Sequence, residues 1–180
     1  AAQLGRNYGI ANSTGQPDLS TSRELVKTAI VNGIDYIDTA RAYGDSENVI
    51  RSALQGGWES RVKVITKLSP LAACLPNSDV DTVHAFVDAS VFQSCMALGV
   101  RRIEVLMLHR ASHVRDWEGA AWQRLRALQS RGLIGELGAS VQNPKELNAV
   151  LKVPQIQYIQ MPFNLMDWRW SAVIPRIAEE

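Results

Sequence analysis

Short segments that are almost continuously apolar recur along the chain, and longer stretches with a different pattern lie between them. The short segments are rich in β-branched residues, which is typical of parallel strands that are covered on both faces. We predict strands at residues 35–40, 62–68, 103–110, 134–140 and 156–163. Residues 2–5 are interpreted as the end of a strand that precedes these five.

Helices are predicted between the strands because their ends carry recognisable signals. Thr21 and Glu24 have the spacing of a capping box, and Gly33 ends the apolar run that follows them. A second helix is expected over residues 80–98 and a third over about 116–131, each followed by a glycine that favours termination.

The clearest helix start lies at Asn143, which Pro144 and Glu146 follow. Asn is a favoured N-cap residue, Pro is favoured at the first helical position, and the acid completes a capping box. The helix expected over 116–131 carries apolar residues at helical spacing. We interpret this stripe as a core face rather than a cofactor site, and it comprises Trp117, Ala121, Leu125 and Leu128.

Strands and helices alternate without a β-hairpin, which indicates an α/β fold with a parallel sheet. An open doubly wound sheet that binds a dinucleotide would carry G-x-G-x-x-G directly after its first strand, and the sequence lacks that motif. We therefore expect a (β/α)8 TIM barrel, of which this chain supplies about six βα units. Because such barrels typically need about 250 residues, we expect residues 1–180 to form one domain that is incomplete at both ends.

The composition is that of an ordinary globular domain, with 46% hydrophobic and 21% charged residues. The formal net charge is +1 without a basic stripe, so nucleic acid is not an expected partner. No run of about 18 apolar residues predicts a membrane span, and no signal peptide is recognised. Cys74 and Cys95 lack metal-ligand spacing, and Cys95 is interpreted as a core residue. Free thiols suit a reducing, cytoplasmic location.

Each predicted strand ends on a polar or ionisable side chain. In α/β folds, chemistry gathers at the carboxyl ends of parallel strands. A single polar strand end commonly means only that the strand has reached water, but five successive ones indicate a site. These residues are Asp38, Lys67, His109, Ser140 and Gln160.

The chemical types at these strand ends suit protonation of a carbonyl oxygen. A buried Lys67 needs a counter-charge, which Asp38 can provide. Tyr43 follows in the next loop, and a neighbouring ammonium is expected to lower its pKa and make it a usable acid. His109 could polarise the carbonyl beside the tyrosine. The reaction that completes this chemistry most simply is delivery of a hydride to the carbonyl carbon.

A zinc site is the weaker interpretation of the histidines. His109 and His113 are four residues apart, but they fall in a strand-to-loop segment rather than on a helix. We therefore expect no metal.

The stretch "DTARAYGDSE" resembles the signature of the aldo-keto reductases, in which Asp, Ala, Tyr, Gly and Glu recur in that order. "VITKL" and "LMLHR" then resemble the segments that carry the family's Lys and His. The first residues, "QLGRNYGIANSTGQP", are similar to the first loop of bacterial members, so the resemblance runs through essentially the whole chain.

This resemblance implies an oxidoreductase that reduces aldehydes or ketones with NADP(H), with NAD(H) as an alternative. Tyr43 would be the proton donor, Lys67 and Asp38 would tune it, and His109 would orient the small-molecule carbonyl substrate. Asp38 would also lie near the nicotinamide ribose. The resemblance assigns the nicotinamide carboxamide to Ser140 and Gln160, whose side chains suit a planar donor–acceptor group. It does not imply an oligomeric state.

Two positions depart from the family pattern. Many members place Asn after the serine of the fifth barrel strand, whereas this chain has Val141, unless Asn143 substitutes for it. Many members follow the catalytic His with Trp, whereas this chain has Arg110. Arg110 either favours an anionic or polar substrate or is a surface residue paired with Asp116 or Glu118.

The resemblance also implies that nucleotide-binding parts of the barrel lie beyond residue 180. Two other functions stay open at this stage. One is a regulatory sensor that binds a nicotinamide cofactor on the same barrel without turnover. The other is an aldolase that forms a Schiff base on Lys67.

Overall fold

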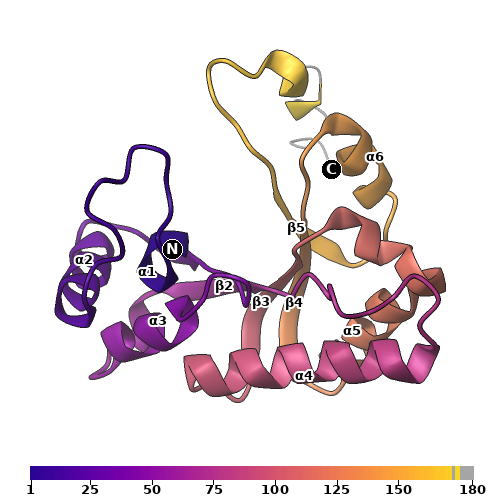
Figure 1. Cartoon of the computed structure of the whole chain (residues 1–180), viewed down its shortest axis with the longest axis horizontal. Coiled ribbons are helices and arrows are strands. Elements are labelled where there is room, and N and C mark those ends of the chain that lie inside the picture. The colour runs from indigo at the N-terminus through magenta and orange to yellow at the C-terminus, as the bar shows by residue number, and fades with distance from the viewer. Residues whose placement is uncertain (172, 175–180) are drawn as a thin grey trace.

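The structure, a computed structural model, describes residues 1–171, 173 and 174 and contains one parallel β-sheet (Figure 1). Its strands lie side by side in the order in which they occur along the chain. They are β1 (Tyr36–Asp38), β2 (Lys63–Lys67), β3 (Ile103–Leu108), β4 (Ile134–Ser140) and β5 (Ile156–Gln160). Every neighbouring pair is parallel, so all five carboxyl ends lie at the same edge of the sheet.

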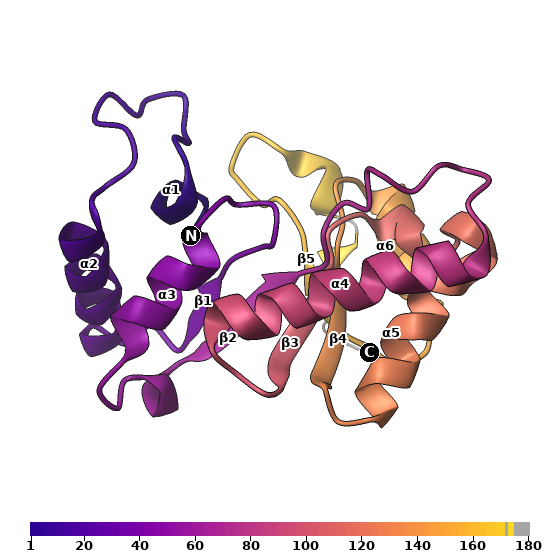
Figure 2. The ribbon, with the colours of Figure 1, turned by 60° about the horizontal axis from the view of Figure 1, so that its bottom comes forward.

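Helices alternate with the strands and cover the outer face of the sheet. Figure 2 shows α3, α4 and α5 following one another along this face. The α-helices are α1 (Ala2–Gly5), α2 (Leu19–Val31), α3 (Ser46–Leu54), α4 (Val80–Leu98), α5 (Ala120–Ser130) and α6 (Pro144–Val150). Short 3₁₀ segments are η1 (Glu59–Arg61), η2 (Ala111–Val114), η3 (Asp116–Gly119) and η4 (Trp168–Trp170).

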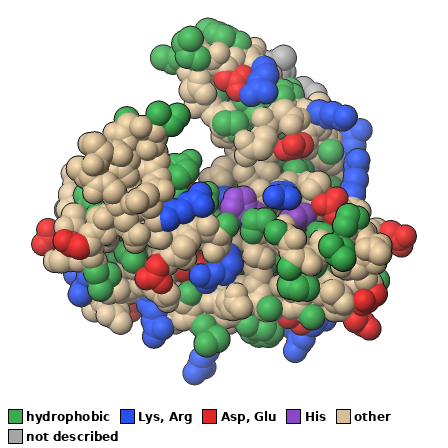
Figure 3. Space-filling view, in the orientation of Figure 1, with side chains coloured by type: hydrophobic (Ala, Val, Ile, Leu, Met, Phe, Trp, Pro, Cys, Tyr) green, Lys and Arg blue, Asp and Glu red, His purple; other side chains and the backbone are tan. Residues whose placement is uncertain are grey.

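The alternation and the sequential strand order make this chain an α/β half-barrel. The outer face packs into a large apolar core with α4 and α5, and a smaller cluster joins α2 and α3 to β1 and β2. The inner face is hollowed, as the space-filling view shows (Figure 3). A cavity of about 540 Å³ on this face is lined by residues that include Ile65, Met107, Tyr158 and Gln160.

The prediction that residues 2–5 end a strand is wrong. These residues form the single helical turn α1, and the amides of Leu4 and Arg6 bond to the carbonyls of Ala1 and Ala2. The segment contains Ala, Gln and Leu, which favour helix, and no β-branched residue. The sheet therefore has five strands over residues 1–171, 173 and 174, rather than the six expected βα units.

The first expected helix starts three residues earlier than the capping-box pattern suggests. Asp18 is the N-cap of α2, and its carboxylate accepts a hydrogen bond of 2.7 Å from the amide of Thr21. Thr21 is thus the third helical residue, and its backbone N–H donates to the capping carboxylate. An aspartate at this position satisfies one of the free amides of the first turn.

The other helix predictions divide into two that are confirmed and one that needs correction. Residues 80–98 form α4, which Gly99 ends in a left-handed conformation, and Asn143 caps α6 through the amide of Glu146. The third helix begins at Ala120 rather than near residue 116. Trp117 and Glu118 have positive φ angles, which interrupt an α-helix.

Candidate active site

The five predicted strand-end residues share one edge of the sheet. Asp38, Lys67, Ser140 and Gln160 are the last residues of β1, β2, β4 and β5. His109 follows the last residue of β3. Ser140 and Gln160 are also partners in the register of β4 and β5, so their side chains lie on the same face. The parallel topology thus gathers the polar ends at the mouth of the half-barrel.

Lys67 and Asp38 form an ion pair at this mouth. The Lys67 ammonium donates to Asp38 Oδ1 at 2.5 Å and to the carbonyl of Thr39 at 3.0 Å. The lysine side chain is 1% exposed, whereas that of Asp38 is 35% exposed. Burial lowers the pKa of Lys67, and the bond to Asp38 opposes this effect. The carboxylate therefore makes a buried ammonium tolerable.

Asp38 also receives a hydrogen bond from the opposite side of the sheet. The amide Nε2 of Gln160 donates to Asp38 Oδ1 at 3.0 Å, so one carboxylate oxygen accepts from both Gln160 and Lys67. This contact joins β5 to β1, the two edge strands. It requires the sheet to curve, because side chains at opposite edges of a flat sheet could not meet.

Tyr43 lies in the loop between β1 and α3, over the ion pair. The ammonium nitrogen of Lys67 is 5.2 Å from the centroid of the Tyr43 ring. The ring meets His109 edge-on, with 5.8 Å between centroids and an interplanar angle of 87°. A tight turn holds the loop, because the amide of Tyr43 donates to the carbonyl of Ala40 at 3.0 Å. Three ionisable side chains thus surround one phenol.

The direction of the Tyr43 pKa differs from the prediction. Burial raises the pKa of the Tyr43 phenol, and the negative charge of Asp38 raises it further. The sequence argument considered only the ammonium of Lys67, whose positive charge favours the phenolate. In the folded protein that charge is paired with Asp38, so desolvation of the phenol dominates. The fold therefore makes Tyr43 a weaker acid than a free tyrosine, and both are protonated at neutral pH.

His109 is neutral near pH 7. Burial lowers its pKa, and the positive charges of Lys67 and Arg110 lower it further. A neutral imidazole has one N–H donor and one acceptor nitrogen. Nδ1 is buried without a hydrogen-bond partner among the residues that the structure describes.

Two neighbours of the site were not foreseen. The guanidinium of Arg6 lies 5.6 Å from the ring centroids of both Tyr8 and Tyr43, because the first residues fold back over the loop. Glu47 lies in the first turn of α3 and is fully buried. Its place in the quoted "DTARAYGDSE" signature was the only sequence signal that it might matter.

The structure decides between the alternatives given above for the positions that depart from the family pattern, Val141, Asn143 and Arg110. Asn143 does not extend to the site, because both ends of its amide bond to Glu146 as part of the α6 cap. Val141 is fully buried in the core. Arg110 is exposed and has no ion pair within residues 1–171, 173 and 174, so the predicted pairing with Asp116 or Glu118 is not formed.

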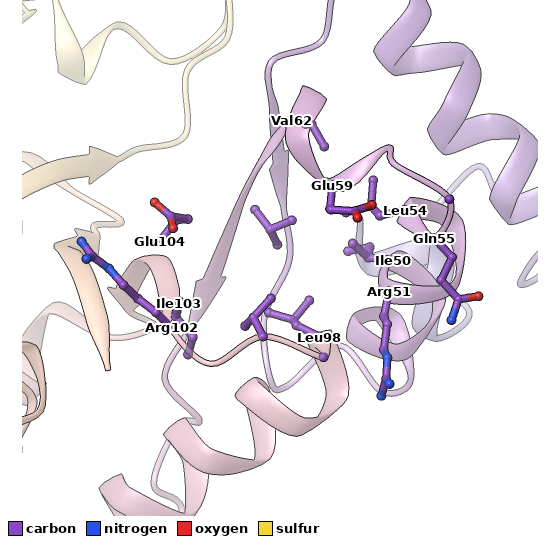
Figure 4. A pocket seen from close by; sticks show the side chains of 14 residues that line it. Ile50, Arg51, Leu54, Gln55, Glu59, Val62, Leu98, Arg102, Ile103 and Glu104 are labelled. Carbon is purple, nitrogen blue, oxygen red and sulfur yellow. The ribbon is translucent and has the colours of Figure 1, made fainter. Parts of the chain in front are cut away.

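Other cavities lie outside this group. Arg110 lines one of about 470 Å³ together with residues of the loops that follow β2 and β3, including His113 and Trp117. Another, of about 480 Å³, lies between α3, the end of α4 and the start of β3 (Figure 4). Arg51, Arg102 and Glu104 line it. It adjoins the amino ends of β2 and β3, at the edge of the sheet opposite Lys67.

Within residues 1–171, 173 and 174, no three His, Cys, Asp or Glu side chains are grouped as metal ligands would be. No helix in this same part of the chain has the length and apolar character needed to cross a membrane.

Comparison with known proteins identifies the family. The sequence model described as "Aldo/keto reductase family" matches residues 3–179. The chain belongs to the aldo-keto reductase family. This confirms the resemblance drawn from "DTARAYGDSE" and the two strands that follow it.

Curated relatives of this aldo-keto reductase chain match at modest identity. An aldo-keto reductase of Mycobacterium sp. (strain KMS) is 28% identical over 152 residues, which cover 81% of this chain and 51% of the relative. The D-arabinose 1-dehydrogenase of Saccharomyces cerevisiae is 27% identical over 132 residues, which cover 71% of this chain and 38% of that enzyme. The matched region thus spans about half of these relatives or less.

Solved structures agree on the fold. A Pseudomonas aeruginosa protein described as an aldo-keto reductase superposes with a TM-score of 0.79 at 26% identity, covering 99% of this chain and 67% of that one. An aldo-keto reductase from Klebsiella pneumoniae in complex with NADPH has a TM-score of 0.71 at 18% identity, with 89% and 54% covered.

Proposed function

We propose that this chain carries the catalytic centre of a reductase that converts aldehydes or ketones to alcohols with NADP(H). The observation that carries the proposal is the position of Lys67. Its ammonium is 1% exposed, is paired with Asp38, and lies 5.2 Å from the ring of Tyr43. A barrel that needed only stability at this point would have no reason to bury an ammonium against a phenol.

Tyr43 is the proton donor in this proposal. The phenol is protonated at neutral pH, as a tyrosine with an ordinary or a raised pKa is, so it can give its proton to a carbonyl oxygen as negative charge develops there. The positive charge of Lys67 beside the ring stabilises the phenolate that is left. Asp38 holds Lys67 in position through the ion pair.

His109 orients the substrate. Its lowered pKa makes the imidazole neutral, so a ring N–H can donate to the carbonyl oxygen without giving up a full proton. The rings of His109 and Tyr43 pack edge-on with 5.8 Å between centroids, and we propose that one carbonyl oxygen binds within reach of both groups. Two donors that converge on one oxygen form an arrangement that stabilises developing negative charge.

The side chains at the mouth fit a nicotinamide cofactor. Ser140 and Gln160 are neighbouring strand-end residues, and a hydroxyl and an amide can bond a planar carboxamide. Asp38 adds an acceptor beside them. Bound NADP(H) would supply the hydride. Support for this cofactor comes from the Klebsiella pneumoniae relative with NADPH; NAD(H) is the alternative.

The proposal extends to the whole protein. We propose that the five described strands belong to a (β/α)8 barrel domain of which residues 1–180 are a part, and that it acts in the cytoplasm on a small-molecule carbonyl. Support comes from the relatives, in which the matched region covers no more than 51% of the curated chains and 67% of a solved one.

The test is Tyr43→Phe with Tyr8→Phe as the matched control. Both tyrosines contact Arg6, but only Tyr43 adjoins Lys67 and His109. NADPH oxidation is followed at 340 nm with a panel of aldehydes. We expect Tyr43→Phe to lose activity by a factor on the order of 10² to 10⁴, as for other general acids, and Tyr8→Phe to keep it.

Other outcomes would change the assignment. Full activity in Tyr43→Phe would contradict Tyr43 as the proton donor. NADPH binding without turnover across the whole panel would favour the regulatory sensor. Borohydride trapping of a substrate on Lys67 would favour the Schiff-base aldolase.

A further inference from the structure

We propose that Glu47 is a positioning residue that holds Tyr43 next to Lys67. It does so by bonding both to the loop that carries Tyr43 and to β2, the strand that carries Lys67. The inference rests on the proposed function for its catalytic consequence, but its structural readout is independent of activity.

Glu47 lies in the first turn of α3 and is fully buried. Its Oε1 accepts a hydrogen bond of 2.7 Å from the hydroxyl of Thr66, and its Oε2 pairs with the guanidinium of Arg41. Both carboxylate oxygens are therefore engaged, one by the strand β2 and one by the loop after β1. A charge is costly to bury unless its partners satisfy it in this way.

Thr66 connects Glu47 to Lys67. The two neighbouring residues at the end of β2 point to opposite faces of the sheet. Lys67 bonds to Asp38 at the mouth, whereas Thr66 is fully buried and bonds to Glu47 at the start of α3. The hydrogen bond from Thr66 therefore fixes the start of α3 relative to the strand end that carries the ammonium.

Arg41 connects Glu47 to Tyr43. Arg41 lies two residues before Tyr43 in a loop that also contacts β2 through its backbone, because the amide of Arg41 donates to the carbonyl of Lys67 at 3.2 Å. The guanidinium then extends to Glu47. Arg41 is thus held at two points, by β2 through its backbone and by α3 through its side chain.

Further hydrogen bonds connect this loop to the start of α3. The hydroxyl of Thr39 donates to that of Ser46 at 2.8 Å in a buried contact, and the amide of Ser46 donates to the carbonyl of Tyr43 at 3.2 Å. Loss of Glu47 would leave these bonds but remove a side chain that bonds to both Arg41 and Thr66. The ring of Tyr43 would then move relative to Lys67.

The experiment compares Glu47→Ala, Glu47→Gln and Thr66→Val with a control, Asp88→Ala. Asp88 pairs with Arg124 through two hydrogen bonds between α4 and α5, away from the mouth. Asp88→Ala therefore removes a paired carboxylate that does not contact the loop of Tyr43, and it shows what the loss of such a pair does by itself. Chains labelled with ¹³Cζ-tyrosine are titrated by NMR, with Tyr43→Phe to assign the resonance of Tyr43.

We expect Glu47→Ala and Thr66→Val to shift the Tyr43 resonance and its titration midpoint, while Asp88→Ala leaves both unchanged. Glu47→Gln should keep most of the wild-type signal, because an amide can accept from Arg41 and donate to the hydroxyl of Thr66. In the reductase assay, kcat should fall on the order of 10-fold or more in Glu47→Ala with KM nearly unchanged, as expected for a misplaced catalytic group.

A lowered melting temperature with an unchanged Tyr43 resonance in Glu47→Ala would overturn the proposal, because the role would then be stability alone. If Glu47→Ala does not fold, an unchanged resonance in Thr66→Val overturns it equally. Failure of the proposed function is distinguishable from this, since it would appear as full activity in Tyr43→Phe, whatever the Tyr43 resonance does in the Glu47 variants.

Discussion

The amide of Gln160 donates a hydrogen bond of 3.0 Å to the carboxylate of Asp38, although 122 positions separate the two residues. Asp38 ends the first strand of the sheet and Gln160 ends the last. The contact shows that the sheet curves far enough for its two edges to share a site at the inner face. Asp38 therefore has two partners, Lys67 and Gln160, that come from opposite parts of the chain.

Replacing Gln160 by Leu is expected to weaken NADPH binding by about 10-fold and to lower the free energy of unfolding by about 1.5–3 kcal/mol, the usual range for a bond to a charged group. The matched control is Gln157→Leu. Gln157 lies on the same strand, but its side chain contacts the backbone of Leu137 rather than Asp38. Fluorescence titration with NADPH and urea unfolding measure the two quantities. Equal loss of NADPH affinity in both variants would contradict a specific role for Gln160.

The two halves of the ion pair are expected to respond unequally to substitution. Asp38→Asn leaves the ammonium of Lys67, which is 1% exposed, without a counter-charge, and should cost about 3 kcal/mol of stability. Lys67→Met should cost less, because Asp38 is 35% exposed and still accepts from Gln160. Urea unfolding at neutral pH compares them. A larger loss of unfolding free energy in Lys67→Met than in Asp38→Asn would contradict this prediction, because it would show that leaving the carboxylate unpaired costs more than leaving the ammonium unpaired.

His109, which is half-buried, and His113, which is buried, should make the protein less stable as the pH falls. Burial is the first cause that lowers the pKa of both His109 and His113 below 6.5. Below that pH the unfolded chain binds protons that the folded chain does not, so stability is full above pH 6.5 and declines as the pH drops toward the folded values. Each histidine contributes at most about 1.4 kcal/mol per pH unit.

The measurement is urea unfolding between pH 8 and 5.5, in the wild type and in His109→Gln/His113→Gln. We expect the pH dependence to be flatter in the double variant, because glutamine has no proton to gain in this range. An unchanged slope would assign the acid sensitivity to other groups.

The start of α2 offers a test of helix capping. Asp18→Ala should lower the melting temperature by about 2–4 °C, the shift typical of one lost cap in a chain of this size. Thr21→Ala should have a smaller effect, because the bond to Asp18 uses the backbone amide of Thr21. Thermal unfolding by circular dichroism compares the two variants. A larger drop in melting temperature in Thr21→Ala than in Asp18→Ala would favour Thr21 as the capping residue, as the sequence pattern suggested.

Prediction from sequence succeeded where the signal was local. Lys67 lies near the end of an almost apolar run, and a strand that turns polar at its end can be recognised within a few residues. Gly99 and Asn143 likewise mark helix ends by their own conformational preferences. The prediction at residues 2–5 failed because four residues carry too little periodicity to separate a strand end from a helical turn.

Charge and burial at the site could not be predicted in the same way. Tyr43 was expected to have a lowered pKa because Lys67 is near, but the balance depends on how deeply the ring is buried and on Asp38. The burial of Glu47 was not predicted from its place at a helix start; in the structure its carboxylate accepts a hydrogen bond from Thr66. Both outcomes depend on groups that the fold brings together and that the order of residues along the chain does not reveal.

Taken alone, the order of apolar and polar residues was sufficient for a parallel α/β fold and for the polar strand ends, and the resemblance of "DTARAYGDSE" was sufficient for the family. Folding in three dimensions decided that Gln160 meets Asp38, that the pKa of the Tyr43 phenol is raised rather than lowered, and that Glu47 is buried between a loop and a strand. The physical reason is range. Backbone preferences act over a few residues, whereas desolvation and Coulomb interactions depend on every group that packs within several ångströms, wherever it lies in the chain.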